Sequence, residues 1–225
     1  MRVGKGEDGS NGRDAAPRFA QPPLRERFVV DDETNIRRAF QLAERGRGIT
    51  SPNPMVGALV VRDGVVIGEG WHEGPGKAHA EPMALVAAGD AVGATLYCSL
   101  EPCDHFGRTP PCTVAIIEAG VSRVVAAVRD PNPSVDGRGF RHLRKAAIEV
   151  TERVLAGEAE RLNEAYFKHT RTGVPFVTLK LAATLDGKIA ASNGSSAWIT
   201  GEEARADVQR LRAAFPACAS FDHPE

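Results

Sequence analysis

The alternation of helical and strand-like segments between residues 32 and 172 is the feature that most constrains the fold. Apolar residues recur at helical spacing from Ile36 to Ala43, and two β-branched runs flank Arg62-Asp63-Gly64, which is typical of a hairpin. The further elements expected are helices at residues 79–89, 110–120 and 155–173, strands at 94–100 and 123–130, and a helix that runs into a short strand at 140–150. Such alternation predicts an α/β fold of three layers, with helices on both sides of a mixed central sheet.

Two other segments flank this domain. Residues 1–31 are rich in Gly, Arg, Pro and acidic residues, and they lack the apolar central region of a secretory signal, so we expect a disordered tail. A new segment begins at Pro175, with a β-rich start, a helix at residues 201–214 and a tail over the last eleven residues. The expected division is therefore 1–31, 32–172 and 175–225, and the second part has an ordinary domain size.

The composition is that of an ordinary globular protein, with 42% hydrophobic residues, 25% charged residues and a formal net charge of -1. This charge gives no general attraction to nucleic acid or to an anionic membrane, and no run of about 18 apolar residues is present. We therefore expect a cytoplasmic protein without nucleic-acid or membrane partners. Since we recognise no export signal, we do not expect its four cysteines to form a disulfide framework.

One imidazole and two thiols form a candidate metal site. His79, Cys103 and Cys112 would be three protein ligands for a tetrahedral zinc ion. The fourth position would then be open to water, as in a catalytic site, although His72 or His105 could close it, as in a structural site. His79 and Cys112 each begin an expected helix, where backbone N–H groups favour the thiolate form of a cysteine. The number of ligands alone leaves both kinds of site open.

Glu81 is the candidate acid and base. It stands two residues after His79, so on the first turn of a helix its side chain points away from the metal ligand. Zinc lowers the pKa of water to roughly 7, and Glu81 could take a proton from that water and pass it to a leaving amine. The order H-x-E, P-C and a second cysteine is the signature of zinc deaminases. We expect Cys98, by contrast, to be a small apolar core residue.

Four stretches of sequence occur in a fixed order: SPNPMVGALVV, GWHEGPGKAHAE, EPCDHFGRTPPC and VRDPNP. Together they closely resemble the deaminase domain of the bacterial deaminase/reductase family of riboflavin biosynthesis, and the resemblance covers about residues 33–220. It implies a cytidine-deaminase-like domain that removes ammonia from 2,5-diamino-6-ribosylamino-4(3H)-pyrimidinone 5′-phosphate by attack of zinc-bound hydroxide on the amino-bearing ring carbon. It also implies that His79, Cys103 and Cys112 bind zinc and that Glu81 shuttles protons.

The same resemblance predicts the substrate pocket. It places six residues there: Asn53, His72, His105, Arg108, Asp130 and Asn132. A phosphate ester needs cationic donors, which His105 and Arg108 can provide. The expected partner is therefore a small phosphorylated pyrimidinone. Members of the family are commonly oligomeric, so self-association into a homo-oligomer is left open.

The segment after Pro175 contains LKLAATLDGKIA and SSAWITGEEARADVQRLRA, which resemble the opening of the same family's NADPH-dependent reductase domain, of dihydrofolate-reductase-like fold. The resemblance places Ala182 and Trp198 at the cofactor, and Ser196 and Arg212 at the substrate. Only about fifty residues follow Pro175, and a half-domain of that size cannot bury a proper core. We therefore expect an incomplete segment with open strand edges and no NADPH-dependent hydride transfer.

Two other functions fit parts of the pattern. A nucleic-acid deaminase, such as a tRNA adenosine deaminase, shares the H-A-E motif but would need the short cysteine spacing and a basic surface. A non-catalytic zinc module that supports a separate reductase would have no use for Glu81. Both alternatives are therefore less favoured than a zinc-dependent hydrolase that acts on a small phosphorylated molecule.

Overall fold

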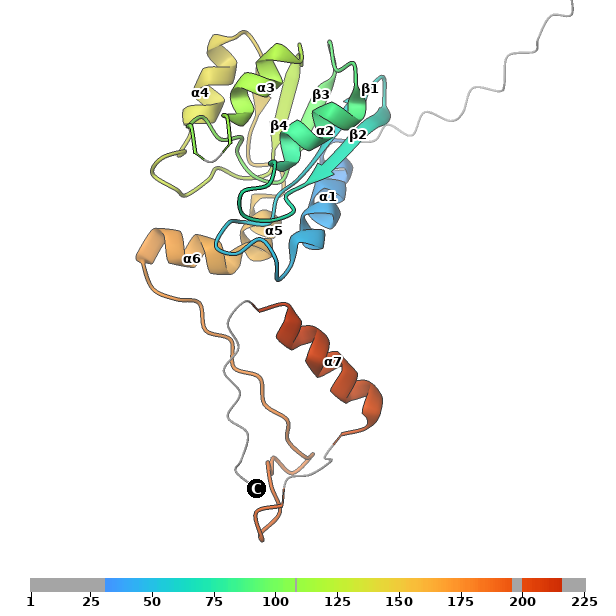
Figure 1. Ribbon diagram of the computed structural model, residues 1–225, viewed down its shortest axis with the longest axis vertical. Coiled ribbons are helices and arrows are strands. Elements are labelled where there is room, and N and C mark those ends of the chain that lie inside the picture. The colour runs from blue at the N-terminus through green and yellow to red at the C-terminus, as the bar shows by residue number, and fades with distance from the viewer. Residues whose placement is uncertain (1–30, 108, 196–199, 216–225) are drawn as a thin grey trace, which may run out of the picture.

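The computed structural model describes residues 31–107, 109–195 and 200–215. Its elements, in chain order, are α1 (Asp32–Ala43), the 3-10 helix η1 (Glu44–Gly46), β1 (Gly57–Arg62), β2 (Val65–Trp71), α2 (Ala80–Ala88), β3 (Thr95–Cys98), α3 (Cys112–Glu118), β4 (Arg123–Ala126), α4 (Arg138–Lys145), β5 (Glu149–Thr151), α5 (Ala156–Leu162), α6 (Glu164–Thr172) and α7 (Glu202–Ala213). The strands form one sheet of order β2-β1-β3-β4-β5 (Figure 1). β1 is antiparallel to β2 and β3, while β3, β4 and β5 are parallel, so the sheet is mixed, as predicted.

The β1–β2 hairpin forms at the predicted place because of its two-residue turn. Asp63 and Gly64 both have positive φ, at 53° and 77°, as a type I′ turn requires. Glycine adopts this conformation without steric penalty, and aspartate tolerates it better than most residues. The pairing register shifts between Val60 and Val61, which adds a bend to the ribbon.

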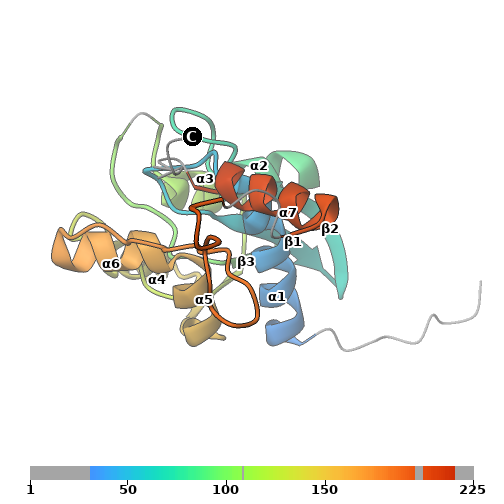
Figure 2. The same cartoon turned by 90° about the horizontal axis from the view of Figure 1, so that it is seen from below.

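Alternate residues of the central strands face opposite helical layers. Val60, Leu96 and Val124 are fully buried in a core that they share with α2, α3 and α4. Their chain neighbours Leu59 and Val125 are buried in a second core, shared with α1, α5 and α6. Figures 1 and 2 show α1 and α5 side by side on this second face of the sheet. The two cores confirm the prediction of a three-layer α/β/α domain.

α2 approaches β2 closely because two strand residues have no side chain. A Cβ atom on Gly70 would lie 2.4 Å from the carbonyl oxygen of Ala80, and one on Gly68 would lie 2.3 Å from that of Ala84. Even close carbon–oxygen contacts in proteins stand about 3.3 Å apart. Any other residue at these two positions would therefore push α2 away from the sheet.

Hydrogen bonds fix the first turn of α1 to the sheet. The side chain of Asp31 accepts a hydrogen bond from the backbone N–H of Thr34 at 2.8 Å and so caps the helix. Asp32 accepts two from the guanidinium group of Arg123, at 2.9 and 2.7 Å, and one from Tyr97 Oη at 2.9 Å. The start of α1 is thereby tied to β3 and β4.

The prediction of one continuous helix at residues 155–173 is wrong, because two helices form there. α5 ends and α6 begins on either side of Asn163, whose φ is −115° and ψ is 31°. The side chain of Asn163 bonds to the backbone of Met55, in the loop that precedes β1. This long-range partner favours a break that the local helical pattern does not reveal.

The segment that begins at Pro175 differs from its predicted form in one respect. Residues 174–195 contain no strand and are almost entirely exposed, whereas the helix expected at residues 201–214 is present as α7. A strand needs a neighbour to receive its backbone hydrogen bonds, and no described strand lies beside this segment. The predicted N-terminal tail covers residues 1–31. Residues 1–30 lie outside the described residues, while Asp31 is not part of a tail, because it is the N-cap residue of α1.

None of the described helices combines the length and the apolar character that crossing a membrane requires.

Candidate active site

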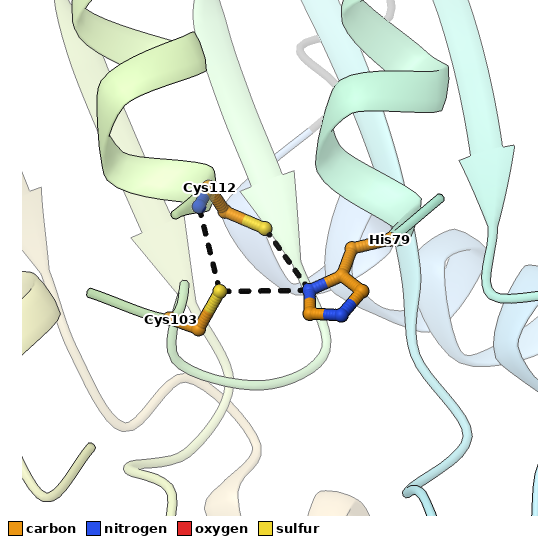
Figure 3. Close-up of side chains that lie close together, drawn as sticks. All are labelled: His79, Cys103 and Cys112. Atoms are coloured by element: carbon orange, nitrogen blue, oxygen red, sulfur yellow. Dashed lines mark hydrogen bonds between the residues drawn. The ribbon is translucent and has the colours of Figure 1, made fainter. Parts of the chain in front are cut away.

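His79, Cys103 and Cys112 converge at one end of the sheet. Their ligand atoms all lie within 4.8 Å of one another, and this is the one such group of metal-binding side chains in the described parts of the chain. His79 Nδ1 is 3.2 Å from Cys112 Sγ and 3.5 Å from Cys103 Sγ (Figure 3). Nitrogen and sulfur ligands of one tetrahedral zinc ion stand about 3.5 Å apart. The donor set and its spacing therefore fit zinc.

Two helix starts and one loop hold these side chains in place. His79 is the N-cap residue of α2, and Cys112 is the first residue of α3. Cys103 lies in the loop after β3, where its sulfur accepts a hydrogen bond from the backbone N–H of Cys112 at 3.4 Å. Its carbonyl oxygen accepts another from the N–H of Thr113 at 3.2 Å. The start of α3 thus supplies one candidate ligand and orients a second.

The two candidate thiol ligands differ in pKa, and that of Cys103 favours metal binding. Hydrogen bonds from Cys112 and His79 lower the pKa of the Cys103 thiol to about 4, so this residue is a thiolate at neutral pH. The neighbouring sulfur of Cys103, together with burial, raises the pKa of Cys112 in the absence of a metal. His79 Nε2 lies 3.4 Å from Thr109 Oγ1, which can fix the ring so that Nδ1 faces the two sulfurs.

Glu81 is buried beside the three candidate ligands but is not one of them. Its Oε2 atom lies 3.5 Å from Cys112 Sγ. Burial raises the pKa of the Glu81 carboxyl to about 7. A carboxyl with this pKa can both take up and release a proton near neutral pH, which suits a general acid and base.

A cavity of about 510 Å³ opens beside this group. Five of the six predicted substrate residues line it: Asn53, His72, His105, Asp130 and Asn132. The sixth, Arg108, lies outside the described residues. Glu81, His79 and Cys103 line the same cavity, so the structure places the candidate chemistry and the candidate recognition residues together.

One wall of the cavity is formed by Asn53 and His72. Asn53 Nδ2 is 3.0 Å from His72 Nε2, and His72 Nδ1 is 3.1 Å from the carbonyl oxygen of Ala78. Burial lowers the pKa of His72, which favours the neutral ring. With Nδ1 donating to Ala78 and Nε2 accepting from Asn53, both ring nitrogens are engaged. This arrangement gives no support to His72 as a fourth metal ligand.

A second wall of the cavity contains Asp130 and Asn132. The buried carboxylate of Asp130 accepts hydrogen bonds from the N–H of Asn132 at 2.8 Å and from Tyr166 Oη at 2.9 Å. The N–H of Asp130 in turn donates to Glu101 at 3.3 Å, and Glu101 also accepts from Gly137 at 2.9 Å. A buried glutamate thus holds the loop that carries Asp130.

Four of the cavity-lining residues that the sequence did not single out have polar side chains: Lys77, Glu101, Thr109 and Tyr166. Three of them fall inside the motifs: Lys77 is in GWHEGPGKAHAE, and Glu101 and Thr109 are in EPCDHFGRTPPC. Those motifs could have marked them. Tyr166 has no such signal, because it reaches Asp130 from a helix 36 residues away.

Of the four residues predicted for the reductase segment, the structure describes two. Ala182 is exposed in the segment without regular structure, and Arg212 is exposed on α7. Neither lines the cavity described above. Ser196 and Trp198 fall outside the described residues.

The chain matches two family models. Residues 29–128 match the cytidine and deoxycytidylate deaminase zinc-binding region. Residues 175–217 match the RibD C-terminal domain. The first match covers all three candidate metal ligands and Glu81.

The chain is also similar to curated proteins along most of its length. The riboflavin biosynthesis protein RibD of Escherichia coli is 53% identical over 185 residues, which are 82% of this chain and 50% of that protein. RibD of Aquifex aeolicus is 53% identical over 182 residues, which are 80% of this chain and 51% of that protein. The chain thus spans about half the length of the curated relatives it matches.

Solved structures of proteins of this kind are also similar to the chain over most of its length. A diaminohydroxyphosphoribosylaminopyrimidine deaminase/5-amino-6-(5-phosphoribosylamino)uracil reductase from Thermotoga maritima matches with a TM-score of 0.77 and 49% identity, over 80% of this chain and 52% of that one. RibD from Acinetobacter baumannii matches with a TM-score of 0.77 and 48% identity, over 81% of this chain and 52% of that one. These neighbours confirm the predicted fold class.

Proposed function

Because the chain belongs by sequence and fold to the RibD family, we propose that residues 32–172 form a zinc-dependent deaminase. The chain spans about half the length of the family members that it matches. The proposed reaction is the hydrolytic deamination of 2,5-diamino-6-ribosylamino-4(3H)-pyrimidinone 5′-phosphate in riboflavin biosynthesis. The observation that supports it most directly is that the buried Glu81 lines the same cavity as two of the candidate metal ligands, His79 and Cys103, with the third, Cys112, beside them.

The proposed chemistry divides between the metal and Glu81. Zinc held by His79, Cys103 and Cys112 would supply a nucleophile near neutral pH, because it lowers the pKa of water to about 7. Glu81 accepts a proton from the water and returns it to the amino nitrogen of the substrate. The ring carbon thereby gains oxygen and loses nitrogen, which leaves as ammonia. A pKa of about 7 lets one carboxyl perform both transfers.

The remaining cavity residues would recognise the substrate. We propose that Asn53 contacts the pyrimidinone ring and that Asp130 and Asn132 bind the ribose, since amides and carboxylates match its polar edges and hydroxyls. His105, which is exposed at the cavity, would bind the phosphate together with Arg108.

Release of ammonia is the measurement that tests this function. The zinc-loaded protein is incubated with the diaminopyrimidinone phosphate, with cytidine and with tRNA in parallel. We expect ammonia from the first compound alone. Turnover of tRNA adenosine would instead support the nucleic-acid deaminase, and zinc binding without any ammonia release would support the non-catalytic module.

We also propose that the chain as given performs no NADPH-dependent reduction. Two observations support this: the described residues 174–195 form no strand, and Ala182 and Arg212 are both exposed rather than held in a buried site. An NADPH oxidation assay with the deaminated intermediate is expected to show no turnover. Clear oxidation that depends on the intermediate would refute this part of the proposal.

A further inference from the structure

We propose that Asn163 and Tyr166, at the junction of α5 and α6, are positioning residues that fix the two walls of the cavity relative to each other. The inference rests on the proposed function, which it extends to the control of substrate affinity. Neither residue lies in the motifs that mark the candidate zinc site. Tyr166 lines the cavity, whereas Asn163 bonds to the loop that carries Asn53.

Asn163 holds the wall that contains Asn53. Its buried side chain accepts a hydrogen bond from the backbone N–H of Met55 at 2.8 Å and donates one to the carbonyl oxygen of Met55 at 2.9 Å. The amide thereby pairs with one residue of the loop as a neighbouring strand would. Met55 stands two residues after Asn53, so this pair limits how far Asn53 can move.

Tyr166 holds the wall that contains Asp130 and Asn132. It follows Asn163 by three residues and lies in the first turn of α6. Its hydroxyl donates to Asp130 Oδ1 at 2.9 Å, and its ring lines the cavity. The same carboxylate oxygen accepts the N–H of Asn132 at 2.8 Å, so the tyrosine stabilises a turn that presents both polar residues.

Both contacts come from the junction of α5 and α6, which is packed on the core. Phe167, next to Tyr166, is buried in the core shared by α1, α5 and α6 and anchors the start of α6. The junction therefore sets the separation of the two walls, and with it the width of the space for the ribose. Loss of either contact should weaken substrate binding more than it slows the chemical step, because Glu81 and the metal ligands have other supports.

Tyr166→Phe tests this through the kinetic parameters. The variant keeps the ring and loses one hydrogen bond to a carboxylate, so we expect KM for the diaminopyrimidinone phosphate to rise about tenfold while kcat stays within about twofold. Combination with Asp130→Asn should raise KM no further than the larger single change, because the tyrosine acts through Asp130. An unchanged KM, a loss confined to kcat, or additive effects would overturn the proposal.

The chain provides a matched control. Tyr97 Oη donates to Asp32 at 2.9 Å, which is the same kind of bond at a place outside the cavity. Tyr97→Phe should lower the unfolding temperature and leave KM unchanged. If it raised KM as much as Tyr166→Phe does, the effect would be one of general stability and the proposal would fail.

A second measurement needs no substrate and so separates this inference from the proposed function. Hydrogen–deuterium exchange at the Met55 amide should be faster in zinc-loaded Asn163→Ala than in the wild type. Asn163→Asp, which keeps the acceptor for that N–H, should restore much of the protection. If the wild type releases no ammonia but exchange behaves as described, the proposed function fails and the positioning stands. Equal exchange in all three proteins would overturn the positioning role.

Discussion

Glu81 is the residue whose surroundings differ most from those of an ordinary surface carboxylate. Glu81→Gln keeps the size of the side chain and removes its ability to accept a proton. We expect ammonia release to fall by at least about 100-fold while zinc content stays that of the wild type. Ammonia and zinc are measured on the same preparation. Activity close to that of the wild type would show that the proton transfer has another route.

Cys112 supports a second prediction at this scale. Its sulfur is buried, 3.2 Å from His79 Nδ1, so Cys112→Ser replaces a soft ligand by a hydroxyl that remains protonated at neutral pH. Bound zinc and deamination should fall together, as measured by atomic absorption and ammonia release. Cys98→Ser is the matched control, because Cys98 is equally buried but donates only to the carbonyl oxygen of Val125. That variant should keep its zinc.

The candidate site was predictable where its residues fall in short motifs. His79, Cys103 and Cys112 are separated by up to 33 residues, yet each stands in a distinctive context that predicts its role. Tyr166 stands in no such motif, and its contact with Asp130 arises only when α6 folds back on the sheet. Contacts between distant segments, such as this one, are what the sequence alone left out.

At the scale of elements, the ion pair between Asp32 of α1 and Arg123 of β4 predicts a pH dependence of stability. Arg123 lowers the pKa of Asp32 from its ordinary value of 3.8. A carboxylate with a lowered pKa in the folded state stabilises the protein above the ordinary pKa, and the contribution is lost as the pH falls through the folded-state pKa. Asp32→Asn should therefore reduce the free energy of unfolding by about 1 kcal/mol at pH 7, because the pair is partly exposed.

Urea denaturation at pH 7, 5 and about 3 checks this prediction. The difference between wild type and Asp32→Asn should persist at pH 5 and shrink at the lowest pH, where Asp32 begins to bind a proton in the folded state. The partner change Arg123→Met should give the same trend. A difference that stayed constant down to the lowest pH would show that the ion pair is not its cause.

Elements whose structure is determined by residues close together in the sequence form where the sequence predicts them. The hairpin turn at Asp63-Gly64 and the helix that starts after His79 depend on residues within a few positions of each other. The break at Asn163 was missed because its cause, the backbone of Met55, is 108 residues away. The strand expected after Pro175 was wrong for a related reason: the local pattern was present, but a strand also needs a partner.

At the scale of the whole molecule, the segment after α6 predicts a solubility effect. Residues 174–195 expose a row of apolar side chains, among them Val177, Leu179 and Leu181. Exposed apolar chain without strand partners favours association between molecules. Removal of residues 174–225 should therefore reduce light scattering at high concentration and leave deamination unchanged. A loss of ammonia release on truncation would show that the segment supports the active site.

The short distance between α2 and β2 has a consequence for how precisely His79 is placed. Because Gly70 has no side chain, the first turn of α2 rests directly on the backbone of the strand, with Ala80 as the point of contact. Main-chain atoms have no rotamers, so the height of this turn above the sheet is as invariant as the strand spacing itself. His79 is the residue before Ala80, so its distance from the sheet is fixed in the same way. The backbone of β2 therefore determines where this candidate metal ligand stands.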